Sequence, residues 1–154
     1  MSLRDRLNDA LKAAMRAKQP RRVNTLRLIL AAVKDRDIAR RAEPDEREDD
    51  QIIQEILGRM IKQRRESVEA YEEGGRLELA EKEREEIAII EEFLPRQLSD
   101  GEIREACEEA IEEVKAASLK DIGRTMGILK SRYAGCMDFS KASREVKDIL
   151  GEGR

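Results

Sequence analysis

Residues 51–76 read QIIQEILGRMIKQRRESVEAYEEGGR, and this stretch decides the fold. Its apolar side chains recur every three or four residues, which is the period of one buried face of an α-helix: Ile53, Ile56, Leu57, Met60, Ile61, Val68 and Tyr71. Gly74 and Gly75 predict the end of that helix and a turn. The helical period resumes over residues 77–94 and stops at Pro95. The stretch therefore predicts two long helices folded against each other.

Two further helices are expected before this pair. Ser2, with Asp5 three residues later, resembles a capping box and precedes a stripe of apolar residues at helical spacing: Leu3, Leu7, Leu11 and Met15. Pro20 suits the first position of a second helix, which fades after Ala42. Residues 43–50 contain no apolar side chain and are expected to be a solvated loop.

Three shorter helices are expected after Pro95. Ser99 and Ser118 each precede an acidic residue by three positions, so each predicts a capped helix start, and a last helix is expected from about residue 138 or 140. No segment alternates as a strand would. The sequence predicts an all-α fold, with a four-helix bundle-like domain over residues 1–95 and a three-helix domain over residues 96–154.

Composition excludes most catalytic and metal sites. The 154 residues include no histidine and no tryptophan, 3% aromatic residues and 42% charged residues. Histidine is the commonest general base and metal ligand, and no carboxylate pair stands out from the charged background, so we expect no enzyme activity, no cofactor and no metal. Cys107 lies on an apolar stripe and is expected in the core. Without a long apolar segment or a leader pattern, no membrane contact and a cytoplasmic location are expected.

The net charge of -3 hides segregation along the chain. Residues 1–41 hold 12 basic and 4 acidic side chains, residues 42–58 hold 1 and 7, residues 99–118 hold 2 and 7, and residues 119–147 hold 7 and 3. One interpretation is that these faces neutralise one another within the fold. The other is that the basic regions, including Arg27, Lys34 and Arg41 at seven-residue spacing, contact a polyanion. So few aromatic residues favour recognition of RNA shape and backbone over base stacking.

Two internal features have both a structural and a functional interpretation. Arg64 and Glu83 fall inside the apolar faces of the paired helices, so we predict an ion pair that fixes their register, in preference to an anion-binding arginine. Gly123 and Gly127 have the spacing that allows close helix packing, which we favour; the alternative is that bare backbone admits an RNA phosphate.

Several motifs resemble the YqeY-like (GatB/YqeY) family. They are KQRRESVEAY at residues 62–71 with GGR at 74–76, AEKE at 80–83, EEFLPRQL at 91–98 and KDIGRTMG at 120–127. The resemblance covers essentially the whole chain. It implies a two-domain helical protein related to the C-terminal tail domain of the GatB subunit of tRNA-dependent amidotransferase, where the tail contacts tRNA and other domains perform the chemistry. Residues 135–141 read GCMDFSK where the family has a pattern like GRADGK, so Cys136 stands in place of the family's arginine.

These observations predict a non-catalytic RNA-binding accessory protein, with tRNA as the expected partner and an amidotransferase or aminoacyl-tRNA enzyme as a possible second one. The alternative is a protein–protein adaptor with no RNA contact, whose acidic segments dock an amidotransferase or another basic partner. The candidate RNA-binding residues, all cationic, are Lys120, Arg124, Lys130, Arg132, Lys141 and Lys147, with Arg65 and Arg76 as secondary candidates.

Overall fold

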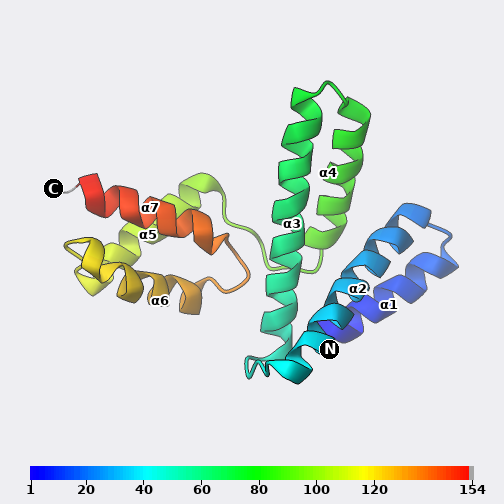
Figure 1. Cartoon of the computed structure of the whole chain (residues 1–154), viewed down its shortest axis with the longest axis horizontal. Helices are drawn as coiled ribbons and strands as arrows, with labels where there is room; N and C mark the ends of the chain where they lie inside the picture. The colour runs from blue at the N-terminus through cyan, green and yellow to red at the C-terminus, as the bar shows by residue number, and fades with distance from the viewer. Residues whose placement is uncertain (153–154) are drawn as a thin grey trace. The chain divides into compact units, whose positions relative to one another are not determined.

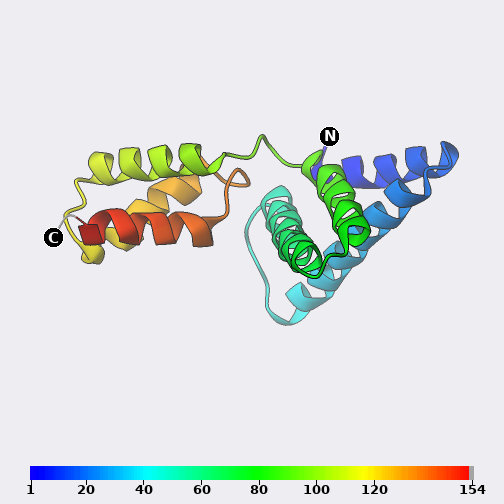
Figure 2. The ribbon, with the colours of Figure 1, turned by 90° about the horizontal axis from the view of Figure 1, so that it is seen from above.

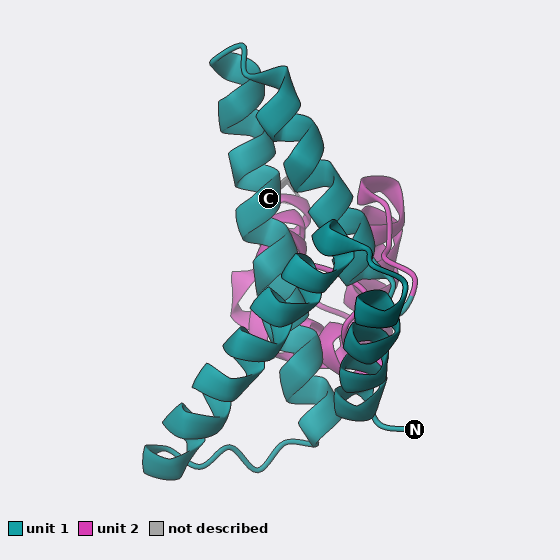
Figure 3. Cartoon of the chain, turned by 90° about the vertical axis from the view of Figure 1, so that its right-hand side faces the viewer, with its two compact units in different colours: residues 1–95 teal, residues 96–154 magenta. Residues whose placement is uncertain are grey.

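The computed structural model describes residues 1–152, which form seven α-helices, one 3₁₀ helix and no strand, so the all-α prediction is confirmed (Figure 1). The elements are α1 (Leu3–Arg16), α2 (Pro20–Ala42), α3 (Asp49–Glu73), α4 (Leu77–Glu91), α5 (Asp100–Val114), η1 (Leu119–Asp121), α6 (Ile122–Arg132) and α7 (Phe139–Glu152). They form two compact units, unit 1 up to Pro95 and unit 2 from Arg96, coloured separately in Figure 3. Residues 153 and 154 of the predicted second domain lie outside the described part.

The helix starts and stops follow the local chemistry of the sequence. The Ser2 hydroxyl accepts the Asp5 backbone N–H at 3.1 Å, and Ser99 and Glu102 exchange both bonds of a capping box. Pro20 is the first residue of α2. Gly75 has φ +73°, a conformation that a Cβ atom disfavours, so a residue without a side chain suits the turn between α3 and α4.

Unit 1 consists of two helical hairpins, α1–α2 and α3–α4, which pack on each other through α2 with α4 and α1 with α3 (Figure 1). Between them lies one continuous apolar core, whose fully buried members include Leu7, Leu26 and Leu57. The predicted stripe on α1 is wrong at Met15, which is 51% exposed, because Ala14 takes the buried position beside it at the end of that helix.

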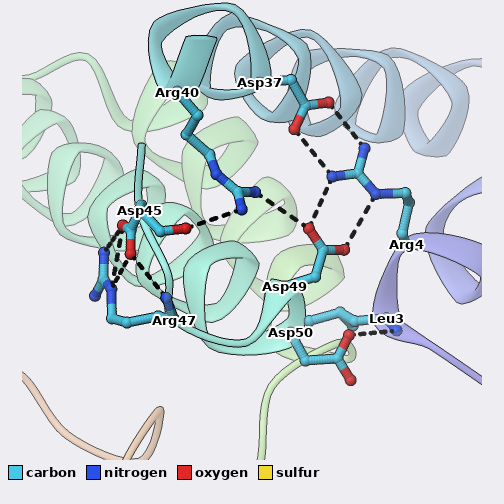
Figure 4. Close-up of polar contacts among 8 residues, drawn as sticks. All are labelled: Leu3, Arg4, Asp37, Arg40, Asp45, Arg47, Asp49 and Asp50. Atoms are coloured by element: carbon cyan, nitrogen blue, oxygen red, sulfur yellow. Dashed lines mark hydrogen bonds and ion pairs between the residues drawn. The ribbon is translucent and has the colours of Figure 1, made fainter. Parts of the chain in front are cut away.

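A network of charged side chains joins the ends of three helices of unit 1 (Figure 4). The Arg4 guanidinium donates to both carboxylate oxygens of Asp37, at 2.9 and 3.0 Å, and to both of Asp49, at 3.0 and 3.1 Å. Asp50 accepts the Leu3 backbone N–H at 3.0 Å. These bonds hold the start of α1 against the last third of α2 and the first turn of α3, and hydrogen bonds from Arg4 lower the pKa of both Asp37 and Asp49.

The predicted partner of Arg64 is wrong. Arg64 Nε lies 3.0 Å from Glu86 Oε2 instead of pairing with Glu83, and both side chains of the observed pair are 14% exposed. In antiparallel helices of equal rise, residues equidistant from the turn lie side by side. Arg64 is ten residues before Gly74 and Glu86 is eleven after Gly75, whereas Glu83 is eight after it. Glu83 lies nearby, where burial raises the pKa of its carboxyl.

In unit 2 the three helices α5, α6 and α7 all contact one another around a second apolar core (Figure 2). Cys107, Leu129 and Val146 are its fully buried centre, one from each helix. Cys107 therefore lies in the core, as predicted, and this burial raises the pKa of its thiol to about 11.

Candidate nucleic-acid interface

Helix α6 carries the central group of predicted RNA-binding residues. Ser118 and Asp121 form a capping box that starts η1 and leads directly into α6. Met126 and Leu129 on the apolar side of α6 are buried in the core of unit 2, so the opposite side of the helix faces solvent. The cap at Ser118 and the spacing of the apolar residues thus decide which residues of α6 face solvent.

The water-facing side of α6 is a strip of residues with little or no side chain. Gly123, Gly127 and Ser131 follow one another at four-residue spacing and are all exposed. A Cβ atom added at either glycine would meet nothing within 4 Å. The favoured interpretation of these glycines as close helix packing is therefore wrong, because no neighbouring element of the described chain covers them.

An open hollow of about 600 Å³ lies beside this strip. It is lined by Val114, Arg124, Gly127, Ile128, Ser131 and Arg132. The structure thus brings two predicted residues, Arg124 and Arg132, to the same concave surface, with apolar side chains between them.

Three of the six predicted cations in unit 2 have no ion-pair or side-chain hydrogen-bond partner among the described residues: Lys120, Lys130 and Lys147, all exposed. Arg124 is also exposed. Its guanidinium donates to the Val114 carbonyl at the end of α5 and lies 3.7 Å from Asp121. Arg124 is thus bonded to the last carbonyl of α5 and paired with Asp121, while 64% of its side chain stays exposed.

Arg132 and Lys141, like Arg124, are each paired with a carboxylate. Arg132 pairs with Glu113 at 2.8 Å, and this hydrogen-bonded contact lowers the pKa of the Glu113 carboxyl. Lys141 pairs with Asp100 at the start of α5. Asp100 is 14 residues, or ~21 Å, along α5 from Val114, so the structure separates Lys141 from the hollow.

The secondary candidates lie in unit 1 and do not form a common site. Arg65 pairs with Glu91 at 3.1 Å across the α3–α4 hairpin. Arg76 is exposed at the start of α4 and has no carboxylate partner in the part of the chain that the structure describes. The two residues are eleven positions apart, with Arg76 at the end of the hairpin.

Nothing in the described residues adds a metal site. No group of three or more cysteine, histidine or carboxylate side chains is arranged there to hold an ion. No helix among the described residues has the length and apolar character needed to cross a bilayer.

The motifs along α3, α4 and α6 agree with a comparison against protein families. The family model described as Yqey-like protein matches residues 4–150, which is nearly the whole chain. The chain belongs to the YqeY-like family. The family match includes both hairpins of unit 1 from residue 4 and all three α-helices of unit 2 through residue 150.

Relatives of this YqeY-like chain carry the name Altered inheritance of mitochondria protein 41, mitochondrial. The protein of Eremothecium gossypii is 33% identical over 88 residues, 57% of this chain and 46% of the relative. That of Clavispora lusitaniae is 33% identical over 108 residues, 69% and 61% of the two chains. That of Pyrenophora tritici-repentis is 27% identical over 152 residues, 95% and 80% of the two chains. The match thus spans about half the length of the first of these relatives.

These comparisons correct the predicted location. The expectation of a cytoplasmic protein rested on the lack of a recognisable leader and of a long apolar segment. The relatives of this YqeY-like chain are named as mitochondrial proteins, which contradicts that expectation.

Proposed function

We propose that this YqeY-like protein is a non-catalytic RNA-binding protein. It contacts the phosphate backbone of a folded RNA, with tRNA as the leading candidate, through the exposed face of α6. The observation that carries the proposal is the exposed strip of Gly123, Gly127 and Ser131 on a helix that also presents lysines without a salt bridge, Lys120 just before it and Lys130 near its end. Exposed glycines in a helix lower its stability by about 1 kcal/mol each relative to alanine, and nothing in the packing of unit 2 requires them. A ligand whose backbone comes close to the helix would explain why glycine occupies these positions despite its cost in helix stability.

The charge around the strip supports an anionic ligand. Lys120 and Lys130 form no salt bridge in the described chain, although backbone hydrogen bonds, with help from the charge of Lys120, lower the pKa of Asp121, and Arg124 stays exposed beside the hollow. Phosphate contacts by such side chains supply most of the affinity in backbone recognition and make it dependent on salt. The resemblance of the family to the tRNA-contacting tail of an amidotransferase subunit supports tRNA as the ligand, and an amidotransferase or aminoacyl-tRNA enzyme as a further partner.

A titration of purified tRNA by fluorescence anisotropy, repeated across a range of salt concentrations, tests the proposal. We expect the double variant Lys120→Gln/Lys130→Gln to reduce the slope of log K against log salt by about two, one for each lost phosphate contact. The double variant Arg104→Gln/Lys141→Gln removes the same charge from two salt-bridged positions on α5 and α7, away from α6, and is the matched control. It is expected to change the slope by less than about one.

Two results would contradict the proposal. One is a wild-type chain that does not bind tRNA even at low salt. The other is an equal loss of slope in both double variants, because net charge would then explain the binding without any contact at α6. Competition by heparin as effective as competition by tRNA would limit the function to polyanion binding.

A further inference from the structure

The outward side of α2 in unit 1 carries a second set of exposed cations. Arg27, Lys34 and Arg41 are all exposed, and consecutive members are ~10 Å apart along the helix. Seven residues are nearly two helical turns, so the three side chains project within about 40° of one another. We call Arg27, Ala31, Lys34, Ile38 and Arg41, which share this side, the α2 strip.

The cations of the α2 strip differ from the other arginines of the same helix. Those that face α3 and α4 are each paired with a carboxylate: Arg21 with Glu85, Arg22 with Glu92, Arg36 with Glu55 and Arg40 with Asp49. By contrast, the three cations of the strip have no carboxylate partner among the described residues. The acidic residues of unit 1 therefore pair with the inner side of α2 and leave the three cations of the strip without a salt bridge.

Large apolar side chains lie among these charges. Ile38, between Lys34 and Arg41, is 50% exposed, and Leu28, at the edge of the strip, is 48% exposed. Asp35, one position after Lys34, is also exposed and lies on the same edge of the helix as Leu28, ~10 Å from it along the axis. Apolar groups between unpaired cations are typical of the mixed surfaces at which proteins bind one another, where arginines and apolar anchors contribute most of the affinity.

This mixture of cationic, apolar and acidic side chains favours a protein as the ligand over a nucleic acid. The phosphates of a nucleic acid would be repelled by the Asp35 carboxylate. Its ribose and phosphate groups would also lose water against the apolar side chains of Ile38 and Leu28 without gaining hydrogen bonds. The strip also has no aromatic residue on which a base could stack. An α-helix with carboxylates at seven-residue spacing would place one charge opposite each cation, and an apolar residue between them would cover Ile38.

We propose that the α2 strip is a docking site for an acidic amphipathic α-helix of another protein. The interaction is separate from RNA binding by α6, because it uses a different unit and a different ligand. Each exposed ion pair contributes little, about a two- to five-fold change in affinity, so specificity depends on all three pairs together with the apolar contact at Ile38.

The test uses the full chain and a synthetic labelled helical peptide of about 20 residues, long enough to span the strip. The peptide has glutamates at seven-residue spacing and leucines one turn after them. The control peptide has the same composition, with the glutamates moved to the opposite face. We expect the first peptide to bind at least about ten-fold more tightly than the control, because only its charges match the spacing of Arg27, Lys34 and Arg41.

Variants of the chain locate the binding. Arg27→Glu/Lys34→Glu/Arg41→Glu is expected to weaken peptide binding at least about ten-fold, and Ile38→Ser about five-fold. The matched control is Lys12→Glu/Arg16→Glu/Arg76→Glu, which makes the same charge change at exposed positions off the strip and leaves peptide binding within about two-fold. Circular dichroism checks that each variant keeps its helical content.

Three outcomes would overturn the docking site. They are equal affinity for the two peptides, unchanged binding by the Ile38→Ser chain, and a larger loss of tRNA affinity in the strip variant than in its matched control. The last outcome would make the strip a nucleic-acid surface. If the peptide binds as expected while tRNA does not bind at all, docking stands and only the RNA-binding proposal fails.

Discussion

Arg64 and Glu86 form an ion pair across the α3–α4 hairpin, with Nε and Oε2 3.0 Å apart and each side chain only 14% exposed. Arg64 also donates to the Met60 carbonyl at 3.3 Å. Removing one partner from such a pair leaves a poorly solvated charge, whereas removing both can be nearly neutral. The pair thus fixes the register of the hairpin more than it adds to stability.

We predict that Arg64→Met lowers the free energy of unfolding by about 3 kcal/mol, and that Arg64→Met/Glu86→Leu recovers at least half of the loss. Urea melts of the two single variants and the double variant measure the coupling. Arg59→Met breaks an exposed pair with Glu55 on the same helix and should cost less than about 0.5 kcal/mol. Simple addition of the two single losses would show that the pair does not interact.

The Arg4 network predicts an acid-dependent loss of stability in unit 1. Asp37 and Asp49 have pKa values below their ordinary value of 3.8, because Arg4 donates hydrogen bonds to both. A carboxyl with a lowered folded-state pKa contributes stability above its unfolded pKa and loses it as pH falls through the folded value. We expect Arg4→Met to cost about 1 kcal/mol at pH 7, a small value because these side chains are partly exposed, and to cost less at pH 2.

Urea melts at several pH values check this prediction. Arg16→Met, which removes an exposed arginine of the same helix without a carboxylate partner in the described residues, is the control and should show no such change with pH. A loss in the Arg4 variant that stays constant from pH 7 to pH 2 would contradict the assignment of the network as the cause.

Substituting the glycines of α6 separates stability from binding. Gly123→Ala/Gly127→Ala is expected to raise the free energy of unfolding by about 1–2 kcal/mol, because helix propensity improves and each new methyl group meets open space. We expect the same variant to bind tRNA more weakly, since Cβ atoms would hold the phosphate backbone away from the helix. Gly58→Ala is the control: it lies in α3, also has nothing within 4 Å, and should stabilise without changing tRNA affinity. A double variant that is more stable and binds tRNA normally would contradict a role for the bare strip.

The two cysteines should differ in reactivity. Cys107 is fully buried and burial raises the pKa of its thiol to about 11, so little reactive thiolate forms at pH 8. Cys136 is partly exposed. Titration with a thiol reagent at pH 8 is expected to modify Cys136 rapidly in the native chain and both cysteines in urea. Mass spectrometry identifies the modified residue, and rapid native modification of Cys107 would show that the core of unit 2 opens readily.

The sequence alone determined the helices, because their signals are local. The apolar period, the serine caps at Ser2, Ser99 and Ser118, and the Gly74–Gly75 turn act over one or two helical turns. They appear in the structure where they were predicted, except that Met15 is exposed. The motifs also indicated the YqeY-like family, which the family match over residues 4–150 bears out.

Only the tertiary structure decided which charged side chains are paired and which are free. Partner choice depends on hairpin register and on which helix faces meet, and a shift of one turn moved the partner of Arg64 from Glu83 to Glu86. The same packing clamps Arg132 and Lys141 while it leaves Lys120 and Lys130 open, and it leaves Gly123 and Gly127 uncovered. A linear charge count treats all these residues alike, because it carries no distance between residues far apart in the chain.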